Sequence, residues 1–227
     1  MNSKEKAAAA ALSYVSNGDV VGAGTGSTAQ VFLEMLAERV RRGELSIEIV
    51  PTSSEVEVNA VRLGLGRLVR QPWQVDEIDV AIDGADAVDP NKNLIKGGGG
   101  ALTREKIIDY GAASFIVIID ESKLVPAIPG GRPIPIEVLP FAWLMVKRTI
   151  ERRFGGEARL RVGNDKRGPV ITDNGNYLLD YSYPIDSIDI DKEAELKAIP
   201  GVVEVGIFNG SRVSKLIIGS SNDVIIK

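Results

Sequence analysis

The sequence predicts an α/β fold, with a parallel-sheet domain and a second, smaller α+β domain. Short apolar stretches alternate with segments of helical periodicity through the first half of the chain, a pattern typical of a parallel sheet covered by helices on both faces. A glycine-rich turn separates the first such stretch from the helix that follows. Closely spaced prolines and glycines from Pro126 to Pro135 then interrupt the alternation and predict a domain boundary.

The elements expected in the first half follow in chain order. Residues 4–16 are good helix formers, and the apolar residues 19–23 predict a buried strand. Helical periodicity returns over 28–42 and stops at Gly43. The other elements expected before the proline-rich run are strands at 47–50, 78–82 and 115–119 and helices at 55–63 and 103–112.

Shorter elements are expected in the second half. They are strands at 136–139, 158–162, 170–172 and 177–181 and helices at 142–153 and 192–199. Two late apolar stretches, 202–208 and 215–218, look like buried strands that could rejoin the first sheet. The predicted domains are therefore a parallel-sheet domain of residues 1–128 plus 204–227 and a small α+β domain of residues 129–203.

The composition limits the chemistry that the chain can perform. With 227 residues, 44% hydrophobic and 26% charged, it has an ordinary globular composition. It contains no Cys and no His, which excludes a Ser-His-Asp triad, a cysteine nucleophile, imidazole acid–base chemistry, zinc fingers and iron–sulfur ligation. Any chemistry must depend on carboxylates, lysine, arginine, hydroxyls and backbone amides.

Charge and hydropathy indicate the partners to expect. The 27 Lys and Arg against 31 Asp and Glu give a net charge of −4 without a basic tail, so we expect no nucleic-acid partner. We expect no membrane partner either, since no apolar run approaches the ~20 residues that span a bilayer. The alanine-rich N-terminus runs into Asn17-Gly18-Asp19, which is a poor signal peptide. The lack of Cys fits a reducing compartment, and a cytoplasmic location is expected.

The first motif is the stretch GAGTGSTA at 22–29. Counted from Gly24 it satisfies G-x-G-x-x-A, one form of the dinucleotide-binding fingerprint. The hydroxyls of Thr25, Ser27 and Thr28 suit the oxygens of one terminal phosphate better than a diphosphate, and the helix N-terminus supplies N–H groups and partial positive charge. The alternative is a tight turn with a Ser or Thr helix cap.

The second motif covers residues 82–106 and combines carboxylates, lysines and glycines. Asp83 ends a predicted strand, where open α/β sheets bind their ligands. The glycines at 97–100 precede a helix, and their amides could form an anion-binding nest or an oxyanion hole rather than a flexible linker. Taken singly, Asp83 and Asp86 could be turn residues, Lys96 a solvated charge and Glu105 a helix-capping glutamate. Their concentration in one segment favours chemistry.

These residues give the chain a resemblance to a known family. The segments that carry it are GTGSTA at 24–29, DGAD at 83–86, KGGGGALTREK at 96–106, DESKLV at 120–125, PIEVLPFA at 135–142, TDNGNYLLD at 172–180 and PGVVEVGIF at 200–208. Over nearly its whole length the sequence resembles the type A ribose-5-phosphate isomerases. The chain has Gly206-Ile207-Phe208 where the family usually has GLF, which is a conservative departure.

The resemblance implies interconversion of ribose 5-phosphate and ribulose 5-phosphate without a metal or organic cofactor. It implies that Glu105, the glutamate of ALTREK, moves a proton between C1 and C2. It also implies that three catalytic side chains contact the sugar oxygens and assist ring opening or proton shuttling, namely Asp83, Asp86 and Lys96. The residues expected to bind the phosphate are Thr25, Gly26, Ser27, Thr28 and Lys4, and those expected to make further substrate contacts are Gly97, Gly98 and Lys123. Lys6 is close enough in sequence to replace Lys4. The family fold implied is a Rossmann-like domain, closed by the last strands of the chain, plus a small α+β domain that contributes oligomer contacts. The family also implies a homodimer or homotetramer.

The implied reaction is chemically consistent with the residues present. An aldose–ketose isomerisation removes a weakly acidic proton next to a carbonyl and passes through a cis-enediolate, whose charged oxygen must be stabilised. One carboxylate can serve both carbons. Lys96 and the amides of Gly97–Gly100 could stabilise the oxyanion, while the anchored phosphate positions the reacting carbons.

Two other functions remain open at this point. A nicotinamide dehydrogenase would fit G-x-G-x-x-A and needs an acidic residue about 20 positions further on, for which Glu44 and Glu48 are available. A non-catalytic sugar-phosphate sensor would bind ribose 5-phosphate without turning it over. We find no extension for binding DNA or a protein partner, which such a sensor would normally carry.

Overall fold

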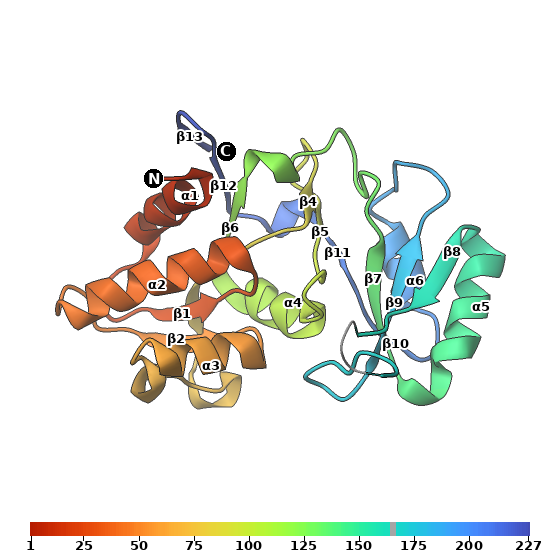
Figure 1. Cartoon of the computed structure of the whole chain (residues 1–227), viewed down its shortest axis with the longest axis horizontal. Helices are drawn as coiled ribbons and strands as arrows, with labels where there is room; N and C mark the ends of the chain where they lie inside the picture. The colour runs from red at the N-terminus through yellow and green to blue at the C-terminus, as the bar shows by residue number, and fades with distance from the viewer. Residues whose placement is uncertain (164–166) are drawn as a thin grey trace. The chain divides into compact units, whose positions relative to one another are not determined.

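Two units of chain make up the structure, a computed structural model that describes residues 1–163 and 167–227. Unit 1 comprises Met1–Ala85, Arg104–Lys123 and Ser211–Lys227, and unit 2 comprises Asp86–Thr103 and Leu124–Gly210 (Figure 1). Each unit has its own hydrophobic core.

A six-stranded sheet forms the centre of unit 1, in the order β13-β12-β6-β3-β1-β2. The strands are β1 (Val20–Ala23), β2 (Glu48–Pro51), β3 (Ile78–Asp83), β6 (Ala112–Asp120), β12 (Lys215–Gly219) and β13 (Val224–Ile226). All neighbours are parallel except β13, which runs antiparallel to β12. The predicted α/β fold class is confirmed, and the late strand at 215–218 does rejoin the first sheet.

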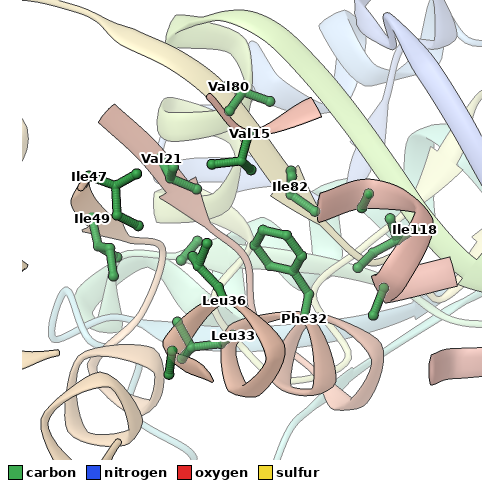
Figure 2. Packing of buried hydrophobic residues seen from close by; sticks show 14 of the residues in the cluster. Val15, Val21, Phe32, Leu33, Leu36, Ile47, Ile49, Val80, Ile82 and Ile118 are labelled. Atoms are coloured by element: carbon green, nitrogen blue, oxygen red, sulfur yellow. The ribbon is translucent and has the colours of Figure 1, made fainter. Parts of the chain in front are cut away.

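Helices cover both faces of this sheet. On one face α1 (Ser3–Ala11), α2 (Ser27–Arg41) and α3 (Ser54–Arg62) share a core with the strands. Figure 2 shows Phe32, Leu33 and Leu36 of α2 turned toward the apolar residues of β1, β2 and β3; their spacing places them on one side of a helix. On the other face lies α4 (Leu102–Gly111). A Cβ added to Gly22 of β1 would lie 2.7 Å from Ile108 Cγ2, so this glycine allows α4 to pack closely.

Unit 2 is built on antiparallel sheets. A four-stranded sheet has the order β10-β7-β9-β8, and a three-stranded one has the order β11-β5-β4. The strands are β4 (Ala87–Val88), β5 (Leu94–Ile95), β7 (Ile134–Val138), β8 (Glu157–Leu160), β9 (Tyr177–Ser182), β10 (Val202–Val205) and β11 (Ile207–Phe208). Helices α5 (Trp143–Phe154) and α6 (Lys192–Lys197) complete its core with Val146, Ile150 and Leu196. Short 3-10 turns lie at Leu12–Tyr14, Gly66–Leu68, Pro72–Gln74, Glu121–Lys123, Pro140–Ala142 and Gly210–Arg212.

Several expectations for the second half were wrong. Residues 202–208 do not rejoin the first sheet, because the stretch divides into β10, which pairs with β7, and β11, which pairs with β5. Residues 170–172 form only an isolated bridge between Ile171 and Tyr177, since the chain turns back at once and the Thr172 N–H bonds the Asn176 carbonyl at 2.9 Å. Pro135 lies inside β7. Proline has no N–H to donate to a neighbouring strand. On the side of Pro135 where the N–H would point, β10 has already ended at Val205, and the Pro135 carbonyl accepts from the Gly206 N–H at 2.7 Å, so the missing donor leaves no strand carbonyl unpaired.

The two units do not coincide with the predicted domains, 1–128 plus 204–227 and 129–203. Residues 86–103, 124–128 and 204–210 group with unit 2. The physical reason is strand pairing, since β5 forms a ladder with both β4 and β11. The boundaries of independently folding domains stay a prediction.

Candidate active site

The strand order of unit 1 reverses beside β1. From β1 the chain goes to β2 on one side and then crosses to β3 on the other, so the switch point lies between β1 and β3. Open α/β sheets bind ligands at this point, outside the carboxyl ends of the strands. Gly24 and Thr25 follow β1 there, and Asp83 is the last residue of β3.

Asp83 and the turn after β1 are in direct contact. The buried Asp83 carboxylate accepts from the Thr25 N–H at 3.0 Å and from the Gly84 N–H at 2.6 Å. Gly24 makes this approach possible, because an added Cβ would lie 2.2 Å from Asp83 Oδ1. The glycine turn thus fits against a carboxylate at the switch point.

The phosphate-loop candidates lie at the start of α2. The helix begins at Ser27 after the N-cap residue Gly26, whose φ of 109° favours glycine, and no side chain caps it. The alternative of a Ser or Thr cap is therefore wrong. The N–H groups of the first turn have no helical partners and carry partial positive charge, which makes this end of α2 suitable for an anion. Ser27 is exposed and Thr28 is buried.

The two N-terminal lysines, Lys4 and Lys6, have different hydrogen-bond partners. Lys4 Nζ donates to Ser27 Oγ at 2.8 Å, whereas Lys6 Nζ donates to the Ser220 and Ser221 carbonyls. Lys4 belongs to α1, but its ammonium therefore lies beside the first residue of α2, where the phosphate is expected to bind. Lys6 instead contacts the turn that contains Ser220 and Ser221.

The positive charges of Lys123 and Lys4 both act on the carboxylate of Asp120. Partial burial alone would raise the pKa of Asp120, but hydrogen bonds from Ser122 and the positive charges of Lys123 and Lys4 outweigh it, and the pKa lies below its ordinary value of 3.8. Both lysines therefore add positive potential on the side of unit 1 where Ser27 lies.

Two hydroxyls that the sequence analysis did not single out support the loop. Thr25 Oγ1 lies 2.8 Å from both Thr52 Oγ1 and Ser53 Oγ, and all three residues are buried. Ser53 also caps α3 by accepting from the Val56 N–H at 3.2 Å. Their position in the sequence could have indicated this role, because Thr52 and Ser53 follow the neighbouring strand β2 as Thr25 follows β1. The hydrogen bonds of the Thr25 hydroxyl thus tie the turn after β1 to the turn after β2.

Glu105 lies in the first turn of α4 and only 4% of it is exposed. A glutamate that serves merely as a helix-end charge is normally solvated, so this burial favours a chemical role. Glu105 belongs to unit 1, as do Asp83 and the start of α2.

The remaining candidates lie in unit 2. Lys96 follows β5, is 2% exposed and has its Nζ 5.5 Å from the centre of the Phe208 ring. Asp86 accepts from the Gly98 N–H at 2.7 Å, and Gly97 has a φ of 102°. The glycine segment is thus an ordered turn held by a carboxylate and not a flexible linker.

Two of the glycine amides are already used within this turn. The Gly98 N–H bonds Asp86, and the Gly100 N–H bonds the Gly97 carbonyl at 3.0 Å. Among the residues that the structure describes, the amides of Gly97 and Gly99 have no such bond. Of the four glycine amides expected to serve an oxyanion, those of Gly97 and Gly99 are therefore the two left for that role.

Comparison with known proteins assigns the family. Residues 48–223 match the family described as Ribose 5-phosphate isomerase A (phosphoriboisomerase A). The chain belongs to this family. The ribose-5-phosphate isomerase A of Pyrococcus horikoshii is 48% identical over 206 residues, which are 90% of this chain and 89% of that protein. That of Methanocaldococcus jannaschii is 45% identical over 222 residues, covering 97% and 95%.

Solved structures of ribose 5-phosphate isomerases agree with the fold. The Methanocaldococcus jannaschii isomerase superposes with a TM-score of 0.92 at 42% identity, covering 99% of this chain and 97% of that one. A D-ribose-5-phosphate isomerase in complex with phospho-erythronic acid gives a TM-score of 0.94 at 46% identity, covering 100% and 99%. As a member of the ribose 5-phosphate isomerase A family the chain is an enzyme, which removes the sensor alternative.

The dehydrogenase alternative lacks its acidic residue. In a dinucleotide-binding fold that carboxylate lies about 20 positions after the glycines, where it reaches the ribose. Glu48 is instead the first residue of β2, at the opposite end of the strand from the switch point, and pairs with Arg70 at 2.8 Å. Glu44 pairs with Arg39 at 3.1 Å. Neither residue serves this isomerase family member as a cofactor ligand at the switch point.

Residues 1–163 and 167–227 contain neither a membrane-spanning helix nor an acidic metal-binding cluster. No helix there is both long and apolar enough to cross a membrane. No cluster of three or more acidic side chains suitable for a metal ion was found in the same residues.

Proposed function

We propose that this isomerase interconverts D-ribose 5-phosphate and D-ribulose 5-phosphate through a cis-enediolate, with Glu105 as the base. The observation that carries the proposal is the uncapped N-terminus of α2 beside Lys4 and the Asp83 carboxylate, at the switch point of the sheet. Such a site suits a small phosphorylated sugar, and phospho-erythronic acid, bound by a 46% identical relative, is a ligand of this kind.

The phosphate is proposed to bind the first turn of α2. The Ser27 and Thr28 hydroxyls and the N–H groups of that turn can donate to its oxygens, and Lys4 adds a full positive charge. Anchoring one end of the sugar in this way lowers the entropic cost of bringing C1 and C2 to the base.

Glu105 is proposed to move one proton between the two reacting carbons. Its carboxylate takes the proton from C2 of the open-chain aldose, and the electron pair moves to the C1 carbonyl oxygen, which gives the cis-enediolate. The protonated Glu105 returns the proton to C1, and the hydroxyl proton of O2 passes to O1, leaving the carbonyl at C2. The burial of Glu105 supports this role because it keeps the transferred proton from exchanging freely with water.

The charged oxygen of the intermediate needs donors. Lys96 is proposed to supply one, and the Gly97 and Gly99 amides are the backbone groups available. Asp83 and Asp86 are proposed to contact the sugar hydroxyls and assist ring opening. Lys123 and Gly98 are proposed to make further contacts with the substrate. These assignments rest on the matched motifs.

A coupled assay that follows ribulose 5-phosphate from ribose 5-phosphate tests the proposal directly. We expect turnover with the purified chain alone. Binding of ribose 5-phosphate by calorimetry without any conversion would contradict the proposed function.

Removing a phosphate-binding hydroxyl should mainly weaken binding. Ser27→Ala or Thr28→Ala should raise KM for ribose 5-phosphate more than it lowers kcat, because the phosphate is unchanged during the reaction. Each loss should be about 1–3 kcal/mol, the range for hydrogen bonds to charged groups. The inhibition constant of inorganic phosphate should rise in parallel. Ser13→Ala, which removes an exposed hydroxyl from a 3-10 turn, is the control. Unchanged KM in both variants would place the phosphate elsewhere.

Chelators should leave the rate unchanged. The proposed oxyanion donors are a lysine and backbone amides, and the chain has no His or Cys to hold a transition metal. We expect the same kcat before and after dialysis against EDTA. A large loss that a divalent cation restores would exclude this mechanism.

A further inference from the structure

Arg161 lies immediately after β8 and reaches the glycine turn. Its Nη1 donates to the Gly97 carbonyl at 3.1 Å and to the Gly98 carbonyl at 3.0 Å. One guanidinium nitrogen thus holds two successive peptide groups of the segment that carries the proposed substrate contacts.

Asp180 fixes the guanidinium from the other side. Arg161 Nε donates to Asp180 Oδ2 at 2.9 Å, and Nη2 pairs with Asp180 Oδ1 at 2.5 Å, which is the two-pronged geometry that arginine forms with carboxylates. Asp180 belongs to β9, an inner strand of the four-stranded sheet. The side chains are only 16% and 27% exposed, so the pair is a rigid mount and not a loose surface contact.

Holding these carbonyls determines where the next amides point. A trans peptide group is planar, with its C=O and N–H directed oppositely. With the Gly97 carbonyl on Arg161, the Gly98 N–H points away from Arg161, and it meets Asp86 at 2.7 Å. With the Gly98 carbonyl on Arg161, the Gly99 N–H is directed away from Arg161 in the same manner. Consecutive glycines resist peptide rotation least of all residues, so this order needs an external hold.

We propose that Arg161 is a positioning residue for the isomerase reaction. It locks the Gly97–Gly98 and Gly98–Gly99 peptides so that the Gly98 amide orients the Asp86 carboxylate and the Gly99 amide faces the sugar. This inference rests on the proposed function, in which Asp86 and the glycine turn contact the substrate. Arg161 itself touches no reacting atom.

Kinetics of Arg161→Ala test the proposal, with Arg159→Ala as the matched control. Arg159 lies two residues earlier, on β8, its side chain is 75% exposed, and it forms an ion pair with the neighbouring Glu157. Arg161→Ala should lower kcat/KM by roughly 10- to 100-fold, since small misplacements of binding groups cost up to that much. Most of the loss should lie in kcat, whereas Arg159→Ala should stay near the wild type. Arg161→Lys should not recover activity, because a single ammonium cannot hold both the carboxylate and the two carbonyls.

Chemical rescue separates positioning from simple loss of stability. Guanidinium, at concentrations that leave the wild-type rate unchanged, should restore part of the kcat of Arg161→Ala, and ammonium should not. A rate for Arg161→Ala equal to that of Arg159→Ala would overturn the proposal. So would a slow variant with a lowered melting temperature that guanidinium does not rescue. If Arg161→Ala is normal while the wild type isomerises and Glu105→Gln is inactive, only this inference fails; if the wild type does not isomerise, the proposed function fails.

Discussion

Replacement of Glu105 by glutamine should abolish turnover and leave the binding of ribose 5-phosphate largely intact. The amide keeps the shape of the side chain and much of its hydrogen bonding, but it has no basic oxygen to accept the C2 proton. The expected loss in kcat is at least roughly 10²–10⁴-fold, the usual contribution of a general base. Steady-state kinetics, calorimetric affinity and the melting temperature of the same variant measure the effect.

Glu55→Gln provides the matched control for this variant. Glu55 also lies in the first turn of a helix, α3, but it is exposed. If Glu105 were only a helix-end charge, both variants would lose about 0.3–1 kcal/mol of stability and keep a near-normal kcat. Retention of more than about a tenth of the wild-type rate by Glu105→Gln, well inside the expected base contribution, would make Asp83 or Asp86 the base to test.

Gly24→Ala should damage both stability and activity. The added Cβ would lie 2.2 Å from Asp83 Oδ1 and 2.4 Å from Asp83 Cα, so the backbone of β1 or β3 must move. Overpacking of this kind costs about 1–3 kcal/mol, and more where backbone is involved. The melting temperature should fall by about 2–4 °C per kcal/mol lost. The displaced Asp83 carboxylate should also lower kcat/KM by roughly tenfold or more.

Gly111→Ala is the control for the added methyl group. Gly111 ends α4, and its Cβ would meet no atom within 4 Å, so this variant should keep the wild-type melting temperature and rate. Normal stability and activity of Gly24→Ala would show that the turn after β1 and Asp83 are not packed as described.

The fold of unit 1 could be predicted because its signals are local. Apolar stretches of four or five residues that alternate with helical segments identify a parallel sheet without knowledge of tertiary contacts. The fate of residues 202–208 could not be predicted in this way. Their composition shows burial, but Gly206 divides the stretch between two sheets, and only the pairings with β7 and β5 determine that.

The sequence predicts where residues of the candidate site lie better than it predicts the hydrogen bonds between them. The positions of Asp83, Thr25 and Ser27 followed from strand and helix ends. The use of the Gly98 amide by Asp86 is a tertiary contact that residue types do not reveal. The same holds for the Thr52 and Ser53 hydroxyls behind Thr25, and for Arg161, which is one of several arginines in its stretch of sequence.

The position of β12 has a consequence for synthesis. This strand lies between β6 and β13 in the sheet of unit 1, but the ribosome makes residues 215–219 only after the whole segment 124–210. Until then β6 has an open side, whose backbone N–H and C=O groups could pair with another chain. At about 5–20 residues per second, that interval is several seconds long. We therefore expect nascent chains stalled before residue 215 to aggregate or to recruit chaperones, and chains released beyond β12 to do neither.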